Sequence, residues 1–190
     1  YTSGFLPSPV VVTTYLINEQ GTLPVISMST HPDSLFHPEL GIYVPGPNAD
    51  PEYPHYGANF WEDRSIATHF EFYEANGDRG ISQLVDLKIH GGRRSRNNPQ
   101  RPLRLTARDR YGEGLIRYPL FPERLPVDSF KTLVLRNSGA DFCLSQFRDG
   151  LFHQIALHHG LDIDVLAFRP ARTYVNGAYW GMLNIRERVD

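Results

Sequence analysis

The chain has 190 residues, of which 41% are hydrophobic, 12% aromatic and 21% charged, and this composition excludes the disordered and fibrous classes. The formal net charge of −2 excludes a general nucleic-acid-binding protein, because the whole chain has no basic excess to attract a phosphate polymer. No apolar run reaches the roughly 18 to 20 residues that a membrane-spanning helix requires, so no membrane span is expected.

The first third of the chain predicts two short strands and a long loop. Val10–Ile17 is rich in β-branched and aromatic residues, which favours a strand, and Leu23–Ser29 predicts another short strand. Proline, glycine and aromatic residues dominate the stretch from His31 to Trp61, which predicts a long ordered loop or a set of short turns whose aromatic side chains pack against the domain. We interpret residues 1–22 as the end of a preceding module or a linker strand, and residues 23–190 as one domain.

A β-hairpin is predicted next. Two alternating runs, Thr68–Glu74 and Leu84–His90, are joined through Asn76-Gly77, a pair that tolerates the positive φ of a tight turn. Because side chains alternate along a strand, the second run predicts an apolar face and a polar face. The apolar face holds Val85, Leu87 and Ile89, and the other face holds Leu84, Asp86, Lys88 and His90.

Two strands and a helix are predicted after an arginine-rich loop. Leu103–Arg108 and Lys131–Arg136 have strand composition. The segment Phe142–His159 predicts a helix capped by Asp141 and ended by Gly160. Its apolar face, at spacings of three and four, consists of Leu144, Phe147, Leu151, Ile155 and His158.

The end of the chain predicts a second hairpin, which completes the expected fold class. Arg172–Val175 and Tyr179–Ile185 flank Asn176-Gly177, the clearest turn signal in the sequence. Strands, one helix and further strands together predict an α+β fold with a mainly antiparallel sheet and one main packed helix.

The glycine- and arginine-rich loop is the strongest candidate for a binding site. Gly91 and Gly92 allow backbone N–H groups to turn toward an anion, and guanidinium groups can hold phosphate oxygens in pairs. The candidate residues are Gly91, Gly92, Arg93, Arg94, Ser95 and Arg96. The spacing matches neither the Walker pattern nor a dinucleotide fingerprint, so a solvated arginine-rich loop is the alternative interpretation.

Other reactive groups give weaker signals. The sole cysteine, Cys143, excludes an intrachain disulfide, and its apolar neighbours favour a buried, inert thiol. His153, His158 and His159 lack the i, i+4 spacing of a helical zinc site. We therefore expect no metal site among these residues.

The chain contains, in order, the segments Lys88–Gly92, Ser95-Arg96, Pro99–Leu105, Tyr111-Gly112, Tyr118–Pro122, Leu133–Asn137 with Asp141, Phe147–Asp149, Tyr174–Gly181 and Arg186-Glu187. Together they resemble the CotH (spore coat protein H) kinase-like family, and the resemblance extends from about Leu23 to Asp190. The resemblance implies the amino-terminal lobe of an atypical protein-kinase-like fold that binds ATP with Mg or Mn. It also implies phosphorylation of protein serine.

The resemblance also assigns roles to single residues. The loop Gly91–Arg96 would lie near the triphosphate, and Arg101 stands where many relatives have lysine. Arg148 and the neighbouring Asp149 would lie on the regulatory helix, where Asp149 either replaces the usual glutamate or forms a surface pair with Arg148. Glu187 would follow the last strand, where a kinase hinge begins, so that the backbone from Ile185 to Glu187 meets the adenine. An exposed strand end is the alternative interpretation.

At the level of the whole protein, the resemblance implies a secreted or cell-surface location and a place among other domains of a larger secreted protein. The acids that hold the metal and orient the substrate hydroxyl would lie in a second lobe. No residue here matches them, so we expect a truncated domain that is inactive alone.

A non-catalytic function is the alternative. The aromatic segment from His31 to Trp61 suits a surface that recognises carbohydrate or protein, because aromatic rings interleaved with polar groups stack on sugars and anchor interfaces. In this interpretation the chain is an extracellular binding or structural module.

Overall fold

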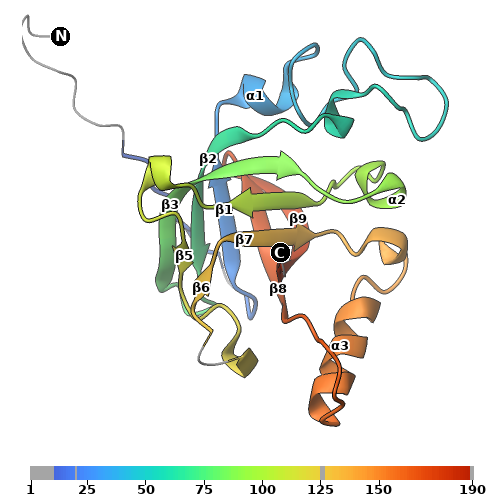
Figure 1. Cartoon of the computed structure of the whole chain (residues 1–190). Coiled ribbons are helices and arrows are strands. Elements are labelled where there is room, and N and C mark those ends of the chain that lie inside the picture. Colours follow the sequence, from blue (N-terminus) through green and yellow to red (C-terminus); the bar gives the residue numbers. More distant parts are fainter. Residues whose placement is uncertain (1–10, 20, 125–126, 189–190) are drawn as a thin grey trace, which may run out of the picture.

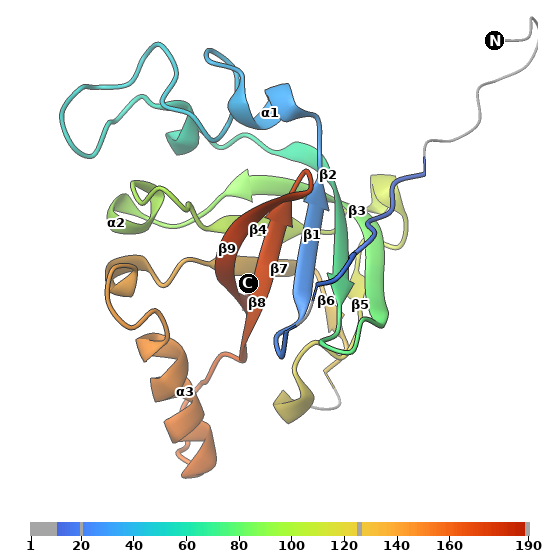
Figure 2. The same ribbon diagram turned by 180° about the vertical axis from the view of Figure 1, so that it is seen from behind.

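Seven strands of one sheet curve into a closed barrel in the computed structural model, which describes residues 11–19, 21–124 and 127–188 (Figure 1, Figure 2). The order around the barrel is β1-β2-β3-β4-β7-β9-β8. The barrel strands are β1 (Val25–Ser29), β2 (Ile66–Tyr73), β3 (Arg79–Ile89), β4 (Leu103–Thr106), β7 (Thr132–Arg136), β8 (Phe168–Val175) and β9 (Ala178–Glu187).

The barrel closes where β1 meets β8. This pairing is parallel, with Ile26 opposite Thr173, whereas the other pairings around the barrel are antiparallel. Pro170 has no backbone donor for a ladder, and it lies on β8 before Arg172, where the pairing with β1 begins. Pro170 therefore lies in the part of β8 that does not pair with β1.

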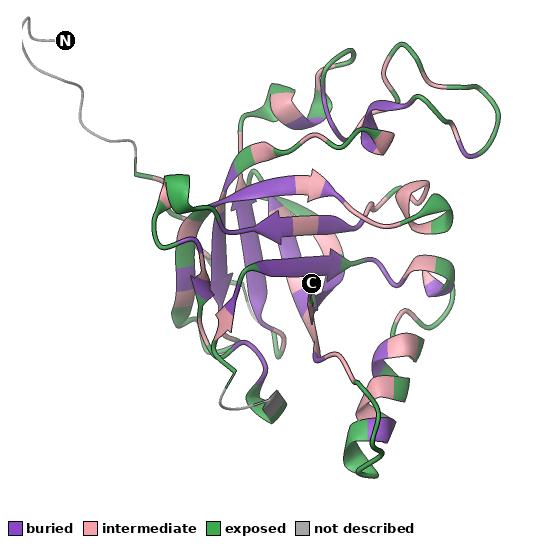
Figure 3. Ribbon diagram, in the orientation of Figure 1, coloured by how far each residue is buried: buried purple, intermediate pink, exposed green. Residues whose placement is uncertain are grey.

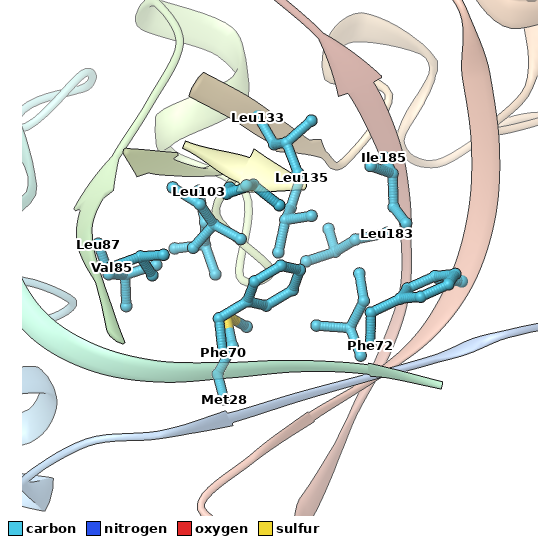
Figure 4. Packing of buried hydrophobic residues seen from close by; sticks show 14 of the residues in the cluster. Met28, Phe70, Phe72, Val85, Leu87, Leu103, Leu133, Leu135, Leu183 and Ile185 are labelled. Atoms are coloured by element: carbon cyan, nitrogen blue, oxygen red, sulfur yellow. The ribbon is translucent and has the colours of Figure 1, made fainter. Parts of the chain in front are cut away.

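The core lies inside the barrel and follows from the alternation of side chains along its strands. Phe70 and Phe72 project inward from β2 and are fully buried (Figure 4). The other strands contribute aliphatic side chains, among them Met28, Val85, Leu87, Leu103, Leu105, Leu133, Leu135, Leu183 and Ile185. Burial is concentrated in the barrel strands, as the colouring of Figure 3 shows.

Short helices and a two-stranded sheet cover the two ends of the barrel (Figure 1). At one end, Leu35 and Phe60 join the core from the long loop; at the other, Phe121 and Phe130 pack edge to face at 5.5 Å. These elements are α1 (Pro32–Phe36), η1 (Asn59–Trp61), η2 (Asp109–Tyr111), β5 (Ile116–Arg117), η3 (Pro122–Arg124) and β6 (Ser129–Phe130). The remaining helices are α2 (Arg93–Arg96), η4 (Gly139–Asp141) and α3 (Arg148–His158).

Both predicted hairpins are confirmed. Gly77 takes a φ of +92° between β2 and β3, and Asn176 and Gly177 take φ values of 49° and 80° between β8 and β9. Both residues of the second Asn-Gly pair thus have the positive φ that such pairs tolerate, whereas in the first pair only Gly77 has it. The strands begin earlier than predicted, and β2 and β3 each end one residue before the predicted limit, at Tyr73 and Ile89.

The predicted α+β fold with one main packed helix, as in a kinase amino-terminal lobe, is wrong. The described chain is mostly β structure, its sheet is closed rather than open, and its helices are short. The helix α3 projects from the barrel, and the residues it buries are Gly150 and Ala156 (Figure 1). The sequence pattern predicted strands in this part of the fold, but it did not predict that β1 and β8 pair.

The predicted helix Phe142–His159 is too long at its start. Asp141 accepts hydrogen bonds from the Ser145 backbone and hydroxyl and from the Arg148 backbone, and Gln146 takes a φ of 61°. Such local side-chain bonds compete with a helix, so α3 begins only at Arg148. At its other end Gly160 adopts a φ of 61°, consistent with its predicted role.

The predicted apolar face of this helix does not pack on the barrel. Leu144 is 68% exposed, and Phe147, Leu151 and Ile155 are each more than 40% exposed. Cys143 is also exposed, so the prediction of a buried thiol is wrong. Of the predicted face, Leu151, Ile155 and His158 lie in α3, whereas Leu144 and Phe147 precede it. The barrel is filled by the side chains of its own strands and leaves no interior surface for this face.

The segment before β1 is not a strand. Residues 11–17 have no regular structure, and Val10 lies outside the described residues. Instead, the Tyr73 hydroxyl donates to the Thr14 carbonyl at 3.0 Å, and the Thr14 and Ser27 hydroxyls lie 2.8 Å apart. This segment therefore runs along the outside of β1 and β2. No described helix has the length and hydrophobicity needed to span a membrane.

Candidate functional site

An open hollow lies between the glycine- and arginine-rich loop and the turn that follows β7. Its volume is about 400 Å³. It is lined by His90, Gly91, Gly92, Arg93, Arg94, Ser95, Pro102, Arg136, Asn137, Gly139 and Ala140. This lining, which we call the loop hollow, includes three arginines and no acidic residue. Its charge suits an anion.

The backbone of the loop is shaped by Gly91. It has a φ of +88°, and a Cβ atom here would lie 2.2 Å from the Ser95 Oγ. Only glycine fits this combination of angle and space. The chain then enters α2, where the Arg96 N–H donates to the Gly92 carbonyl at 3.0 Å. The earlier N–H groups of this short turn have no intrahelical acceptor.

Side-chain amides hold the two sides of the loop hollow together. The Asn137 Nδ2 donates to the Ser95 carbonyl at 3.0 Å and to the Gln100 carbonyl at 2.7 Å. The Asn98 Nδ2 donates to the Gly139 carbonyl at 3.2 Å. These bonds fix the loop relative to the end of β7.

The predicted arginines divide into two groups. Arg93 and Arg94 lie at the rim of the loop hollow, and the Arg93 guanidinium lies 5.1 Å from the centre of the Tyr53 ring. Arg96 turns away and donates to the Gly91 carbonyl at 2.7 Å and to the Phe60 carbonyl at 2.6 Å. It therefore braces the loop instead of lining the hollow.

Arg101 also lies away from the loop hollow. Its guanidinium lies 3.9 Å from the centre of the Phe60 ring and donates to the carbonyls of Tyr43, Arg96 and Asn98. Burial lowers the pKa of Arg101 from its usual value. The charge of this residue is thus used to hold three loop carbonyls in place.

Two further predicted residues, Arg148 and Glu187, do not line the loop hollow. The Arg148 NH2 lies 3.1 Å from the Asp141 Oδ1 at the surface. The Glu187 Oε1 accepts from the Ala167 N–H at 2.8 Å. Glu187 instead lines a second, adjacent hollow.

The second hollow lies over the outer face of β7 and β9 and shares His90 and Arg136 with the first. Its lining is His90, Val134, Arg136, Leu166, Arg186, Glu187 and Arg188. We call it the Arg186 hollow. The Asp149 Oδ2, which projects from α3, lies 2.8 Å from the Arg136 Nε and 3.1 Å from the Arg186 NH1. Asp149 therefore pairs with these two arginines and not with Arg148.

Sequence reasoning missed Arg136, Asn137 and Arg186 as members of these hollows. Strand register provides the signal that would have found Arg186. On the outer face, Lys88 lies opposite Arg104, Arg104 opposite Val134, and Val134 opposite Arg186. The order of these strands around the barrel is needed to see that row.

The basic residues of this face affect one another. Burial, together with the charges of Arg104, Arg188, Arg96 and Arg136, lowers the pKa of His90 to about 4. Burial and neighbouring arginines also lower the pKa of Lys88. At neutral pH His90 is therefore uncharged, although it lies between the two hollows.

The aromatic residues of the long loop mostly serve the fold. Phe60 is 1% exposed and Tyr43 is 9% exposed. The Trp61 Nε1 donates to the Pro54 carbonyl, and its ring lies 5.3 Å from that of Tyr56. Phe36, Tyr53 and Tyr56 are the aromatic residues of the loop that remain exposed, so the aromatic surface is smaller than the sequence predicts.

The described residues do not provide a metal site of their own. Among them there is no group of three or more histidine, cysteine, aspartate or glutamate side chains placed to hold a metal ion. The lining of the loop hollow is cationic, whereas magnesium and manganese prefer oxygen ligands. The residues present fit a phosphate chain and do not fit a bare divalent cation.

Comparison with known proteins gives one finding. Residues 87–190, a little over half of the chain, match a family model described as CotH kinase protein. The matched region begins near the end of β3 and includes every residue that lines the two hollows. A search of curated proteins gives no match.

Proposed function

The chain belongs to the CotH kinase protein family, and on this premise we propose that the loop hollow binds the phosphate groups of ATP. The observation that carries the proposal is the lining, with three arginines, a glycine turn and no acid. Arginine N–H groups and turned backbone amides are the donors that phosphate oxygens accept from most favourably.

In this proposal Arg93 and Arg94 bind the phosphate oxygens, since both line the loop hollow and neither forms an ion pair with an acid in the described structure. Gly91 and Gly92 allow the backbone to approach the phosphates. Arg96, Arg101 and Asn137 have an indirect role, because their hydrogen bonds keep the loop in position.

Bound ATP supplies the phosphoryl group, and the residues of this chain orient it and offset its negative charge. Since the loop hollow has no carboxylate, a magnesium or manganese ion would reach it on the phosphates of the nucleotide. We assign no described residue to accept the proton of a substrate hydroxyl. We therefore propose that these 190 residues bind nucleotide without transferring its phosphoryl group by themselves.

The finer parts of the proposal rest on the family. We propose that the protein acts on serine residues of a protein substrate, that it is secreted or displayed at the cell surface, and that further domains accompany this one. The acids needed for phosphoryl transfer would come from a part of the protein other than the described barrel.

Titration calorimetry of the chain with ATP and magnesium tests the proposal. The double variant Arg93→Gln/Arg94→Gln is expected to bind ATP at least tenfold more weakly, a loss of about 1.4 kcal/mol. Arg117→Gln is the matched control, because Arg117 is exposed and pairs with Glu113 far from the loop hollow. The proposal fails if the unaltered chain does not bind ATP, or if the double variant binds it equally well.

A further inference from the structure

We infer that the Arg186 hollow is a second anion site, which takes a phosphate or carboxylate group, and that the Asp149 carboxylate competes with this ligand for Arg136 and Arg186. The site is distinct from the loop hollow, although the two share His90 and Arg136. The inference goes beyond the proposed nucleotide site, because it concerns a different set of arginines and an acid that would compete with the ligand.

The first observation is the state of Arg186. Its side chain is 5% exposed, and its NH1 lies 3.1 Å from the Asp149 Oδ2. Its Nε is buried and has no hydrogen-bond partner among the described residues. A buried charged donor without an acceptor costs free energy, so Asp149 leaves the guanidinium of Arg186 incompletely satisfied.

The second observation is the charge around the hollow. The lining holds three arginines, Arg136, Arg186 and Arg188, and one acid, Glu187. Two of these arginines, Arg136 and Arg186, share one oxygen of the Asp149 carboxylate. An external anion in the hollow would offer additional acceptor oxygens to these two guanidinium groups.

The third observation is how Asp149 reaches the site. It lies in the first turn of α3, and its Oδ2 serves both Arg136 and Arg186 while its Oδ1 accepts from the Gly150 N–H. The helix rests on the barrel through Gly150, where even a Cβ atom would lie 2.7 Å from the Phe168 ring. The carboxylate is therefore delivered by a helix whose residues are largely exposed.

The anion could come from either of two sources with the same chemistry. A phosphate of a nucleotide bound in the loop hollow could extend past His90 and Arg136, which both hollows share. An acidic side chain of a protein substrate could enter instead. In both cases the ligand would replace Asp149 as the acceptor for two guanidinium groups.

Binding of inorganic phosphate to the whole chain, measured by titration calorimetry, tests the inference. Asp149→Asn is expected to tighten phosphate binding by roughly tenfold, since it removes a competing negative charge and keeps the side-chain shape. Arg136→Gln is expected to weaken it by a similar factor. Arg136 is nearly half exposed, so this variant should fold even if a change at Arg186 does not.

Two further binding measurements identify which molecule supplies the anion. In the first, the affinities of tripolyphosphate and phosphate are compared. If tripolyphosphate binds more tightly, and this difference in affinity is lost in Arg93→Gln/Arg94→Gln, one ligand spans both hollows. In the second, a hexaglutamate peptide is added as a competitor of phosphate. If it displaces phosphate, and does so more strongly in Asp149→Asn, the anion comes from an acidic side chain of a protein substrate. If Asp149→Asn binds phosphate equally or more weakly, the inference is overturned. ATP binding to the loop hollow would still stand in that case, because the proposed function is tested by Arg93 and Arg94.

Discussion

The two faces of the same four strands, β3, β4, β7 and β9, have opposite chemistry. One row across them, Ile89, Leu103, Leu135 and Ile185, points into the barrel, and each side chain is at most 2% exposed. The adjacent row, Lys88, Arg104, Val134 and Arg186, points outward beside the two hollows. The two rows occupy consecutive positions on each strand, so no residue separates the apolar row from the outward-facing row.

The inner and outer faces of these four strands therefore have different roles, one in stability and the other in binding. The inner row stabilises the barrel by removing apolar surface from water. The outer row gathers positive charge on a chain whose formal net charge is −2. A shift of register by one residue would exchange the two rows, so the register must be maintained for the protein to fold and to bind. The following predictions test the separation.

The largest effect is expected from the inner face. Leu105→Ala should lower the free energy of unfolding by about 2–5 kcal/mol, because Leu105 is fully buried and its truncation leaves a cavity. Urea denaturation followed by circular dichroism measures this. At temperatures where the variant is folded, its affinity for ATP should be unchanged. A matching loss of affinity would show that the two faces are not separable.

The next effect concerns His90, whose pKa of about 4 lies below its usual value of 6.5. Between these values the unfolded state binds a proton that the native state does not, so the free energy of unfolding falls as the pH falls from about 6.5 to 4. Below about 4 this contribution levels off. NMR titration of the His90 ring should give the low pKa directly.

His90→Gln should remove that part of the pH dependence. Bound phosphate should raise the pKa of His90, because a nearby negative charge favours the protonated ring. A His90 pKa that is ordinary in the free chain would contradict the electrostatic description of the outer face.

A smaller effect is expected from alanine substitution at one of two neighbouring glycines, Gly91, and not at the other, Gly92. Gly91→Ala should cost about 1–2 kcal/mol and weaken ATP binding, because its positive φ is unfavourable for a side chain and its Cβ would meet Ser95. Gly92→Ala is the matched control, since its φ is −107° and no atom lies within 4 Å of the added Cβ. Thermal unfolding and calorimetry measure both. Equal effects would mean that the loop geometry is not what supports binding.

The smallest effect is expected on the outer row. Lys88→Gln should change the free energy of unfolding by about 1 kcal/mol or less, because its partner Asp63 is 83% exposed and its other close neighbours are arginines. Denaturation in parallel with Leu105→Ala checks this. A loss comparable with that of the inner-face variant would show that the basic row stabilises the barrel.

Local signals in the sequence predicted much of the fold. The Asn76-Gly77 and Asn176-Gly177 turns gave both hairpins, and alternation assigned the two faces of β3 correctly. Closure of the barrel was not predictable in this way, since it depends on β1 pairing with a strand far along the chain. The helical spacing of Leu151 and Ile155 was real, but spacing does not specify whether a partner surface exists.

The candidate site was predictable in part. The residues from Gly91 to Ser95 line one hollow, and the phosphate binding that the composition of this loop suggests stays a prediction. Arg96 and Arg101 belong to the same stretch, yet their guanidinium groups bind backbone carbonyls. Residue type and spacing do not show which way a guanidinium points. Nor do they show that Asp149 meets Arg136 and Arg186, because those contacts join three separate elements.

The parallel pairing of β1 with β8 also has a consequence for the kinetics of folding. Because Ile26 must find Thr173, closure is a contact of high sequence separation, and such contacts form slowly. On the ribosome β1 would emerge long before β8, with one edge open to association with other chains. Residues 87–190, the part that matches the family model, lack β1, β2 and all of β3 before Leu87. Expressed alone, that part would leave β8 and most of the sheet edge beside β4 without their neighbouring strands, and we expect it to aggregate.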